Sequence, residues 1–71
     1  MDFTEEELRE ARRQIGSMLH KLRETRRTLQ AKGNRCKPQI TLAERRIRAF
    51  EIADFLIGRE LLAFDNRREG T

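Results

Sequence analysis

The sequence has few of the residues that build sheets, disulfides or metal sites. It contains no tryptophan, no tyrosine, one proline and four glycines, and its β-branched residues never form the alternating run that a strand requires. We therefore expect helices and no sheet. The single cysteine, Cys36, excludes a disulfide within the chain and a cage of several thiolates around a metal. We expect it to be an unpaired loop thiol, with a redox or intermolecular role as the alternative.

Long hydrophobic runs are also absent. No segment approaches the roughly 20 apolar residues that a membrane-spanning helix needs, and the first residues, MDFTEEEL, are acidic, unlike a secretory signal. We therefore expect a cytoplasmic protein without a membrane partner. The 71 residues are enough for one domain. At this size a single core rarely supplies more than about 3–5 kcal/mol without added staples or self-association, so we expect an oligomer.

The first half of the chain has the pattern of one amphipathic helix. Thr4 and Glu7 form the sequence of an N-terminal capping box, and Phe3 is placed to pack on Leu8. The following apolar residues recur at intervals of seven, as in a coiled-coil seam. Gly33 accepts the left-handed conformation that often ends a helix. The seam consists of Leu8, Ile15, Leu22 and Leu29.

The second half predicts another helix of similar length. Pro38 is expected to prevent an immediate restart, and Thr41 with Glu44 forms a second capping box. Two helices of matched length joined by a short loop predict an all-α antiparallel helical hairpin. The expected boundaries within this single domain, residues 1–71, are helix 1 at 4–32, a loop at 33–40, helix 2 at 41–65 and a frayed tail at 66–71.

Helix 2 has more apolar surface than one neighbouring helix can cover. One stripe centred on Phe50 should face helix 1, and other apolar residues lie up to about 200° away on the helical wheel. We expect the hairpin to form a homodimer, most simply a four-helix bundle, with a different protein as the alternative partner. The inward stripe is Ala43, Ile47, Phe50, Ile57, Leu61 and Phe64, and the predicted interface is Ile52, Phe55, Leu56 and Leu62.

Asp54 interrupts the inward stripe of helix 2. A buried carboxylate without a partner is costly, so we expect this residue to pair with an arginine or a polar group and to fix the register of the helices. In the simplest hairpin register Asp54 lies near Leu19 and His20. Lys21 and Arg23 are then one turn away. A ligand-binding carboxylate is the alternative interpretation.

Positive charge is concentrated around the predicted loop. Residues 23–48 contain nine basic and two acidic residues, a net charge of +7, whereas the rest of the chain has a net charge of −3. A solvated surface that pairs with acidic groups explains this cluster, and nucleic-acid binding is the alternative. No helix-turn-helix spacing or aromatic stacking platform accompanies the charge. The residues best placed for contact are Arg35, Lys37, Arg45 and Arg48.

No group of residues has the pattern of a catalytic, cofactor or metal site. His20 has no second ligand at metal-binding spacing and is expected on the polar side of helix 1. The carboxylates Glu51, Asp54 and Glu60 are not arranged by the sequence around a concave polar pocket. We therefore predict that the protein is not an enzyme and takes no cofactor, metal or small-molecule substrate.

Two segments, RQIGSMLHKL and QITLAERRIRAFEIADFLIGREL, together resemble short uncharacterised bacterial two-helix proteins, in which a variable loop joins the helices. The likeness covers most of the chain and consists of a general pattern of Leu, Ile, Arg and Ala. It implies the helical hairpin. It implies no activity, cofactor or site residue.

Overall fold

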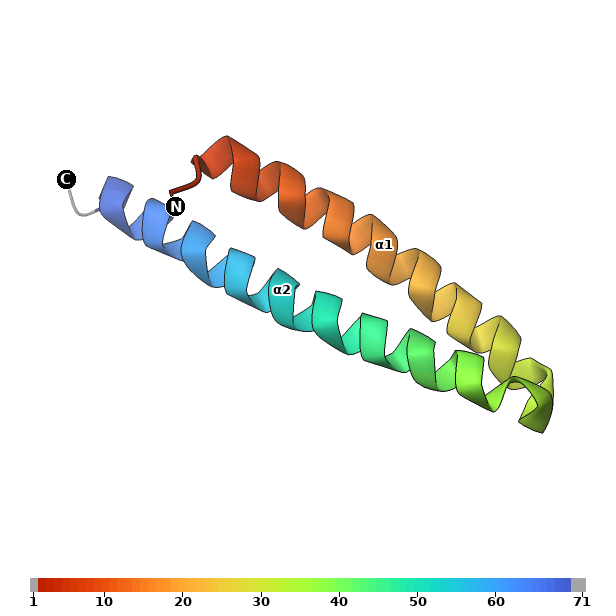
Figure 1. The fold of residues 1–71 in the computed structure, drawn as a ribbon. Coiled ribbons are helices and arrows are strands. Elements are labelled where there is room, and N and C mark those ends of the chain that lie inside the picture. Colours follow the sequence, from red (N-terminus) through yellow and green to blue (C-terminus); the bar gives the residue numbers. More distant parts are fainter. Residues whose placement is uncertain (1, 70–71) are drawn as a thin grey trace.

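The chain forms an antiparallel helical hairpin (Figure 1). The computed structural model describes residues 2–69, with side chains described up to residue 67. Helix α1 spans Glu5–Ala31 and helix α2 spans Lys37–Glu69, and a 3₁₀ turn, η1, spans Gly33–Cys36 between them. No strand occurs among residues 2–69, so the prediction of an all-α hairpin is confirmed.

Helix α1 begins as the sequence predicts. The Glu7 amide donates a hydrogen bond of 3.1 Å to Thr4 Oγ1, and the Thr4 amide donates one of 3.1 Å to Glu7 Oε1. These bonds satisfy amide groups that have no partner within the first turn of the helix. At the other end Gly33 has a φ of +76°, a conformation that glycine adopts without steric cost. The predicted start and stop signals of the first helix are therefore both used.

Helix α2 begins four residues before its predicted start at Thr41. Pro38 lies in the first turn, where its missing N–H is not needed for an intrahelical bond and its fixed φ suits the helix. The proline therefore helps to begin the helix, contrary to the prediction, and Thr41 lies inside it. The helix also continues to Glu69, so most of the predicted frayed tail is helical. Residues 70–71 of that tail lie outside the described residues.

The two helices share a thin core along the predicted stripes. The most buried side chain is Ile47, which is 3% exposed, and no side chain among the described residues is less than 2% exposed. The remaining residues of both predicted stripes are half-buried. The predicted pairing of the stripes is therefore confirmed, but it closes only a narrow strip of surface. The buried apolar residues are Leu19, Ala43, Ile47 and Leu61.

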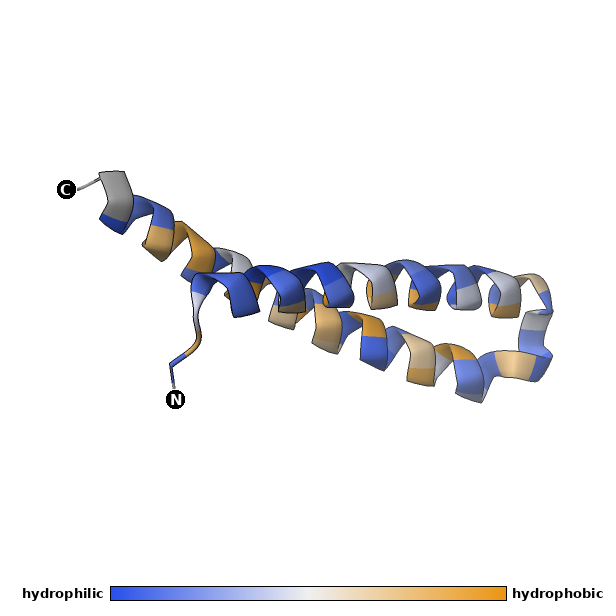
Figure 2. Cartoon of the chain, turned by 90° about the horizontal axis from the view of Figure 1, so that it is seen from above, coloured by the Kyte–Doolittle hydropathy of each residue, from blue (hydrophilic) through white to orange (hydrophobic). Residues whose placement is uncertain are grey.

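The hairpin is a long, narrow object, with principal dimensions of 56 × 19 × 16 Å. The start of α1 and the end of α2 lie together at one end, and η1 lies at the other (Figure 1). Hydropathy differs between the helices: α1 is largely hydrophilic, whereas hydrophobic residues recur along the whole of α2 (Figure 2). One helix therefore carries most of the apolar surface that the hairpin leaves uncovered.

Candidate interaction surface

A continuous row of exposed residues runs along α2 on the side away from α1. Its seven members follow one another at steps of three and four residues, which keeps them on one face of a helix for about 32 Å. Phe55 is 66% exposed and Leu62 is 61% exposed. We call this row the outer seam. It consists of Arg45, Arg48, Ile52, Phe55, Arg59, Leu62 and Asn66.

The two edges of the outer seam differ in chemistry. One edge carries Ala49, Leu56 and Ala63, which are small or apolar. The other edge carries acidic residues that are already paired with α1. Arg23 Nη2 lies 3.3 Å from Glu51 Oε2, and Arg9 Nη2 lies 3.6 Å from Asp65 Oδ1. Ion pairs with α1 therefore occupy one edge, while the seam itself contains no acidic residue.

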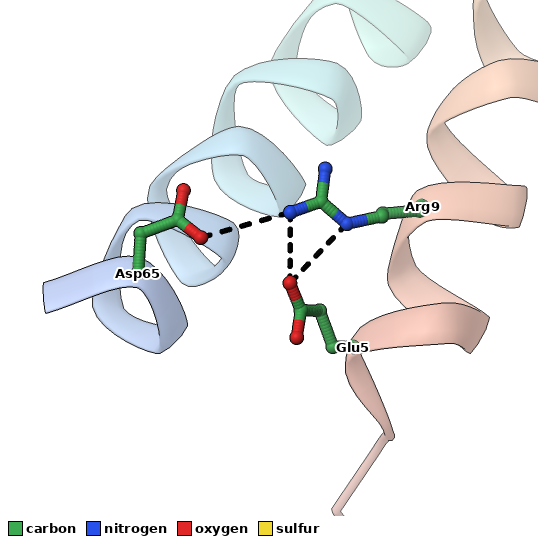
Figure 3. Close-up of polar contacts among 3 residues, drawn as sticks. All are labelled: Glu5, Arg9 and Asp65. Atoms are coloured by element: carbon green, nitrogen blue, oxygen red, sulfur yellow. Dashed lines mark hydrogen bonds and ion pairs between the residues drawn. The ribbon is translucent and has the colours of Figure 1, made fainter. Parts of the chain in front are cut away.

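Arg9 connects the two helices at the terminal end of the hairpin (Figure 3). Its Nη2 donates a hydrogen bond of 2.8 Å to Glu5 Oε1 within α1 and also faces Asp65 of α2. The hydrogen bond and the negative charge of Glu5 raise the pKa of the Arg9 guanidinium, and Asp65 adds to the effect. Because this arginine is exposed to solvent, water screens the pairing strongly. The contact orients the end of α2 and contributes little to stability.

Asp54 does pair with an arginine, but the arginine is Arg12, two turns from the predicted neighbours. Arg12 Nε donates a hydrogen bond of 3.2 Å to Asp54 Oδ1, while Arg23 pairs with Glu51. The Asp54 side chain is 33% exposed, so it lies at the margin of the core and not within it. Gly58 explains the difference, because a Cβ there would lie 2.9 Å from Arg12 Nη2. The Arg12 guanidinium thus lies against α2 at Gly58, where no side chain blocks it.

Three of the four predicted interface residues belong to the outer seam, the fourth lies on its edge, and they do not share a single hollow. Phe55 and Leu62 line a depression of about 460 Å³ together with Arg9 and Arg12. Ile52 and Phe55 line a second depression, of about 410 Å³, with Arg48. Leu56 lies on the small, apolar edge of the seam and is 45% exposed. Phe55 is therefore the centre of the exposed apolar surface, since it borders both depressions.

The predicted basic residues do not form one patch at the loop. Arg35 lies in η1 and Lys37 begins α2, whereas Arg45 and Arg48 belong to the outer seam. Lys37 and Arg48 are separated by about 16 Å along the helix axis. All four side chains are exposed, and none has an ion-pair partner within the part of the chain that the structure describes. The structure separates them into a pair at the tip and a pair along the seam.

Other candidate groups lie apart from one another. His20 is exposed on α1, and Cys36 is a free, half-buried thiol in η1. Among the described residues, no three His, Cys, Asp or Glu side chains are arranged to hold a metal ion. Neither α1 nor α2, over residues 2–69, has an apolar stretch of the length required to cross a membrane.

The signals that sequence reasoning missed are small ones. The first is Gly58, a glycine inside a helix, whose missing side chain leaves space for the Arg12 guanidinium. The second is Arg59, which lies in the seam with Phe55 and Leu62. Comparisons of the chain with protein-family models, curated proteins and solved structures found no match. The resemblance to short bacterial two-helix proteins therefore stays a sequence-based expectation.

Proposed function

We propose that the chain is a homo-oligomeric interaction module in which the outer seam of one hairpin docks on a second copy, giving an assembly of four helices. The observation that carries the proposal is the exposure of large apolar residues on the face of α2 that α1 leaves uncovered. Ile52, Phe55 and Leu62 are 47%, 66% and 61% exposed. Contiguous apolar surface of this kind is typical of a docking site.

The accessible surface of the hairpin supports a second copy as the occupant. A folded monomer of 8.5 kDa is expected to expose about 4,700 Å², whereas this chain exposes 5947 Å². The excess is more than the about 800 Å² that each partner buries in a standard interface. A dimer would therefore bring the exposed area per chain close to that of a compact protein.

The thinness of the core points the same way. Among the side chains that the structure describes, four are buried, and three of these lie on α2. A second hairpin against the outer seam would cover α2 on both of its apolar faces, as a helix with apolar residues most of the way round requires. Association would thus stabilise each hairpin in addition to holding the copies together.

Sedimentation of matched leucine variants tests the proposal. Leu62→Gln removes an apolar side chain from the seam in both copies, and each is worth about 1.5–3 kcal/mol when fully buried, so we expect the dimer dissociation constant to rise at least tenfold. Leu42→Gln is the matched control, because Leu42 is 48% exposed but lies outside the seam. Wild-type protein that stays monomeric at 100 µM would reject self-association and would point to a different protein as the partner.

A second candidate function is binding of nucleic acid at the tip. Arg35 and Lys37 are exposed and have no acidic partner among the described residues, so both are available to phosphates. Changing both residues to glutamine should reduce affinity and flatten the dependence on salt without altering the dimer, since neither belongs to the seam. A fluorescence titration at about 150 mM salt that finds nothing tighter than about 10⁻⁶ M would reject this candidate.

A further inference from the structure

We infer that the two copies pack with their α2 helices antiparallel, about a two-fold axis level with Ile57, so that Arg59 of each copy lies on the partner's Phe55. This inference rests on the self-association proposed above and specifies its geometry. It follows from the order of residues in the outer seam, in which Arg45 and Arg48 come first, Ile52 and Phe55 follow, and Arg59 separates these two from Leu62. Each orientation of the partner brings a different set of these residues together.

A parallel pair of α2 helices would place like charges opposite one another. In a parallel seam each residue lies level with its own copy, so Arg45, Arg48 and Arg59 would each face an identical arginine. No acidic residue within the seam could offset this repulsion. The same orientation would set the two basic loop ends, each of net charge +7 over residues 23–48, side by side. Both local and overall charge therefore oppose it.

An antiparallel pair can avoid these contacts in one register. In it, Ile52, Arg59 and Asn66 of one seam lie opposite Leu62, Phe55 and Arg48 of the other, and Arg45 lies beyond the end of the partner's seam. When Ile52 faces the partner's Leu62, Phe55 faces the partner's Arg59 and Arg48 faces the partner's Asn66. A shift of one heptad toward the loop places Arg48 against the partner's Arg59. A shift of one heptad away from the loop leaves Ile52 without an apolar partner. A shift of two heptads toward the loop has the same effect.

The chosen register gives Arg59 a partner that it lacks in the hairpin. Among the described residues Arg59 makes no ion pair, and it is exposed beside Phe55. A guanidinium above an aromatic face is attracted by the ring quadrupole. The chain already forms such a contact elsewhere, with Arg67 Cζ 5.0 Å from the centre of the Phe64 ring. The small residues Ala49 and Ala63 on the edge of the seam leave room for close approach of the helices.

Site-specific disulfides distinguish the registers. In a Cys36→Ser background, I52C mixed with L62C should form an intermolecular disulfide in at least tenfold higher yield than either variant alone, because cross-linking requires Cα atoms within about 7 Å. R48C mixed with N66C should behave in the same way. This second pair leaves every apolar residue of the seam intact, so it keeps the test valid if the first pair weakens the dimer. Sedimentation and circular dichroism of each variant verify assembly and helix content.

Each other result has a definite meaning. Disulfides formed by I52C alone or R48C alone would show parallel helices and overturn the inference. Disulfides between I52C and F55C, or between R48C and R59C, would show the register shifted by one heptad and also overturn it. A dimer without any of these disulfides would place the interface on another face or in one of the two remaining registers, and would also overturn the inference. Monomeric wild-type protein would instead reject the proposed function itself, which keeps the two failures distinguishable.

Discussion

The two helices of the hairpin differ in how many neighbours they need. Among the described residues, α1 exposes one large apolar side chain, Met18, whereas α2 exposes five. The contrast is visible along the whole molecule, where hydrophobic segments recur on α2 but α1 is mostly hydrophilic (Figure 2). Helix α1 has one apolar stripe and one partner. Helix α2 has apolar residues on two faces, and the hairpin supplies a partner for only one of them.

This difference shows that the two faces of one helix can have separate structural roles. The inward face of α2 determines the hairpin, since Ala43, Ile47 and Leu61 are buried against α1. The apolar residues of the outward face are largely exposed in the hairpin, so they contribute much less to the folding of a single chain. Surface of this kind favours association, because covering it removes apolar area from water.

A pair of isoleucines on the two faces of α2 gives the largest expected contrast. Ile47 is 3% exposed and Ile52 is 47% exposed. Ile47→Ala should lower the free energy of unfolding by about 2–5 kcal/mol, enough to unfold much of a marginally stable hairpin, because it leaves a cavity in a thin core. Urea denaturation followed by circular dichroism measures the loss.

Ile52→Ala is the matched control for this substitution. At protein concentrations low enough to keep the chain monomeric, it should change the free energy of unfolding by less than about 0.5 kcal/mol. At high concentration its effect should grow, because it then also weakens association. Equal effects of the two alanine variants at low concentration would contradict the division of α2 into an inner and an outer face.

Two glycines in the helices allow a sharper comparison of a polar contact. A Cβ added at Gly16 meets nothing within 4 Å, whereas one added at Gly58 displaces the Arg12 guanidinium. Gly16→Ala should therefore raise the free energy of unfolding by about 1 kcal/mol through helix propensity alone. Gly58→Ala should raise the free energy of unfolding by less, because it disturbs the Arg12–Asp54 ion pair. That pair is partly exposed and worth about 0–1 kcal/mol.

Repeating both glycine substitutions in an Arg12→Ala background isolates the ion pair. Without the guanidinium, the two alanine variants should gain equal stability in urea denaturation. If Gly58→Ala still gained less stability than Gly16→Ala, some group other than the Arg12 side chain would have to occupy the space above Gly58.

The sequence predicted the fold well because the fold depends on local signals and a simple period. The capping box at Thr4 and Glu7 and the glycine stop at Gly33 act over a few residues, and the inward stripes are repeated along both helices. The start of α2 was wrong for a local reason too, because Pro38 can either end or begin a helix. Here the 3₁₀ turn η1 separates the two helices, and Pro38 lies in the first turn of the second one.

The candidate site was less predictable, because it depends on how side chains cross between helices. The exposed residues Ile52, Phe55 and Leu62 followed from the helical wheel, since outward-facing positions need no knowledge of packing. The partner of Asp54 did not follow, because the long side chain of Arg12 reaches it across the gap at Gly58. Helix periodicity fixes the face on which a residue lies, but not the direction in which a flexible arginine extends.

The contact inferred between Arg59 and the partner's Phe55 predicts a smaller effect. A double-mutant cycle with Arg59→Gln and Phe55→Leu, read out as dimer dissociation constants, should give a coupling energy of about 0.5–1 kcal/mol for each cation–π contact. Arg48→Gln in place of Arg59→Gln is the control and should show no coupling with Phe55→Leu. Coupling of Phe55 to Arg48 alone would indicate the contact of Arg48 with the ring in a different register.

The smallest effect is expected at Arg9, and its dependence on pH tests whether the terminal ion pairs matter. The pKa of Arg9 is raised in the folded state, by the hydrogen bond to Glu5 first and by nearby negative charge second. A group whose folded pKa is raised stabilises the protein fully below its unfolded pKa and loses that contribution only as pH rises through the folded value. For an arginine this range is strongly alkaline, so the contribution is constant between pH 6 and pH 9. Arg9→Gln should therefore lower the melting temperature by the same small amount at both pH values, and by less in high salt, because an exposed pair is screened. A difference that changed between pH 6 and pH 9 would require a second titrating group in contact with Arg9.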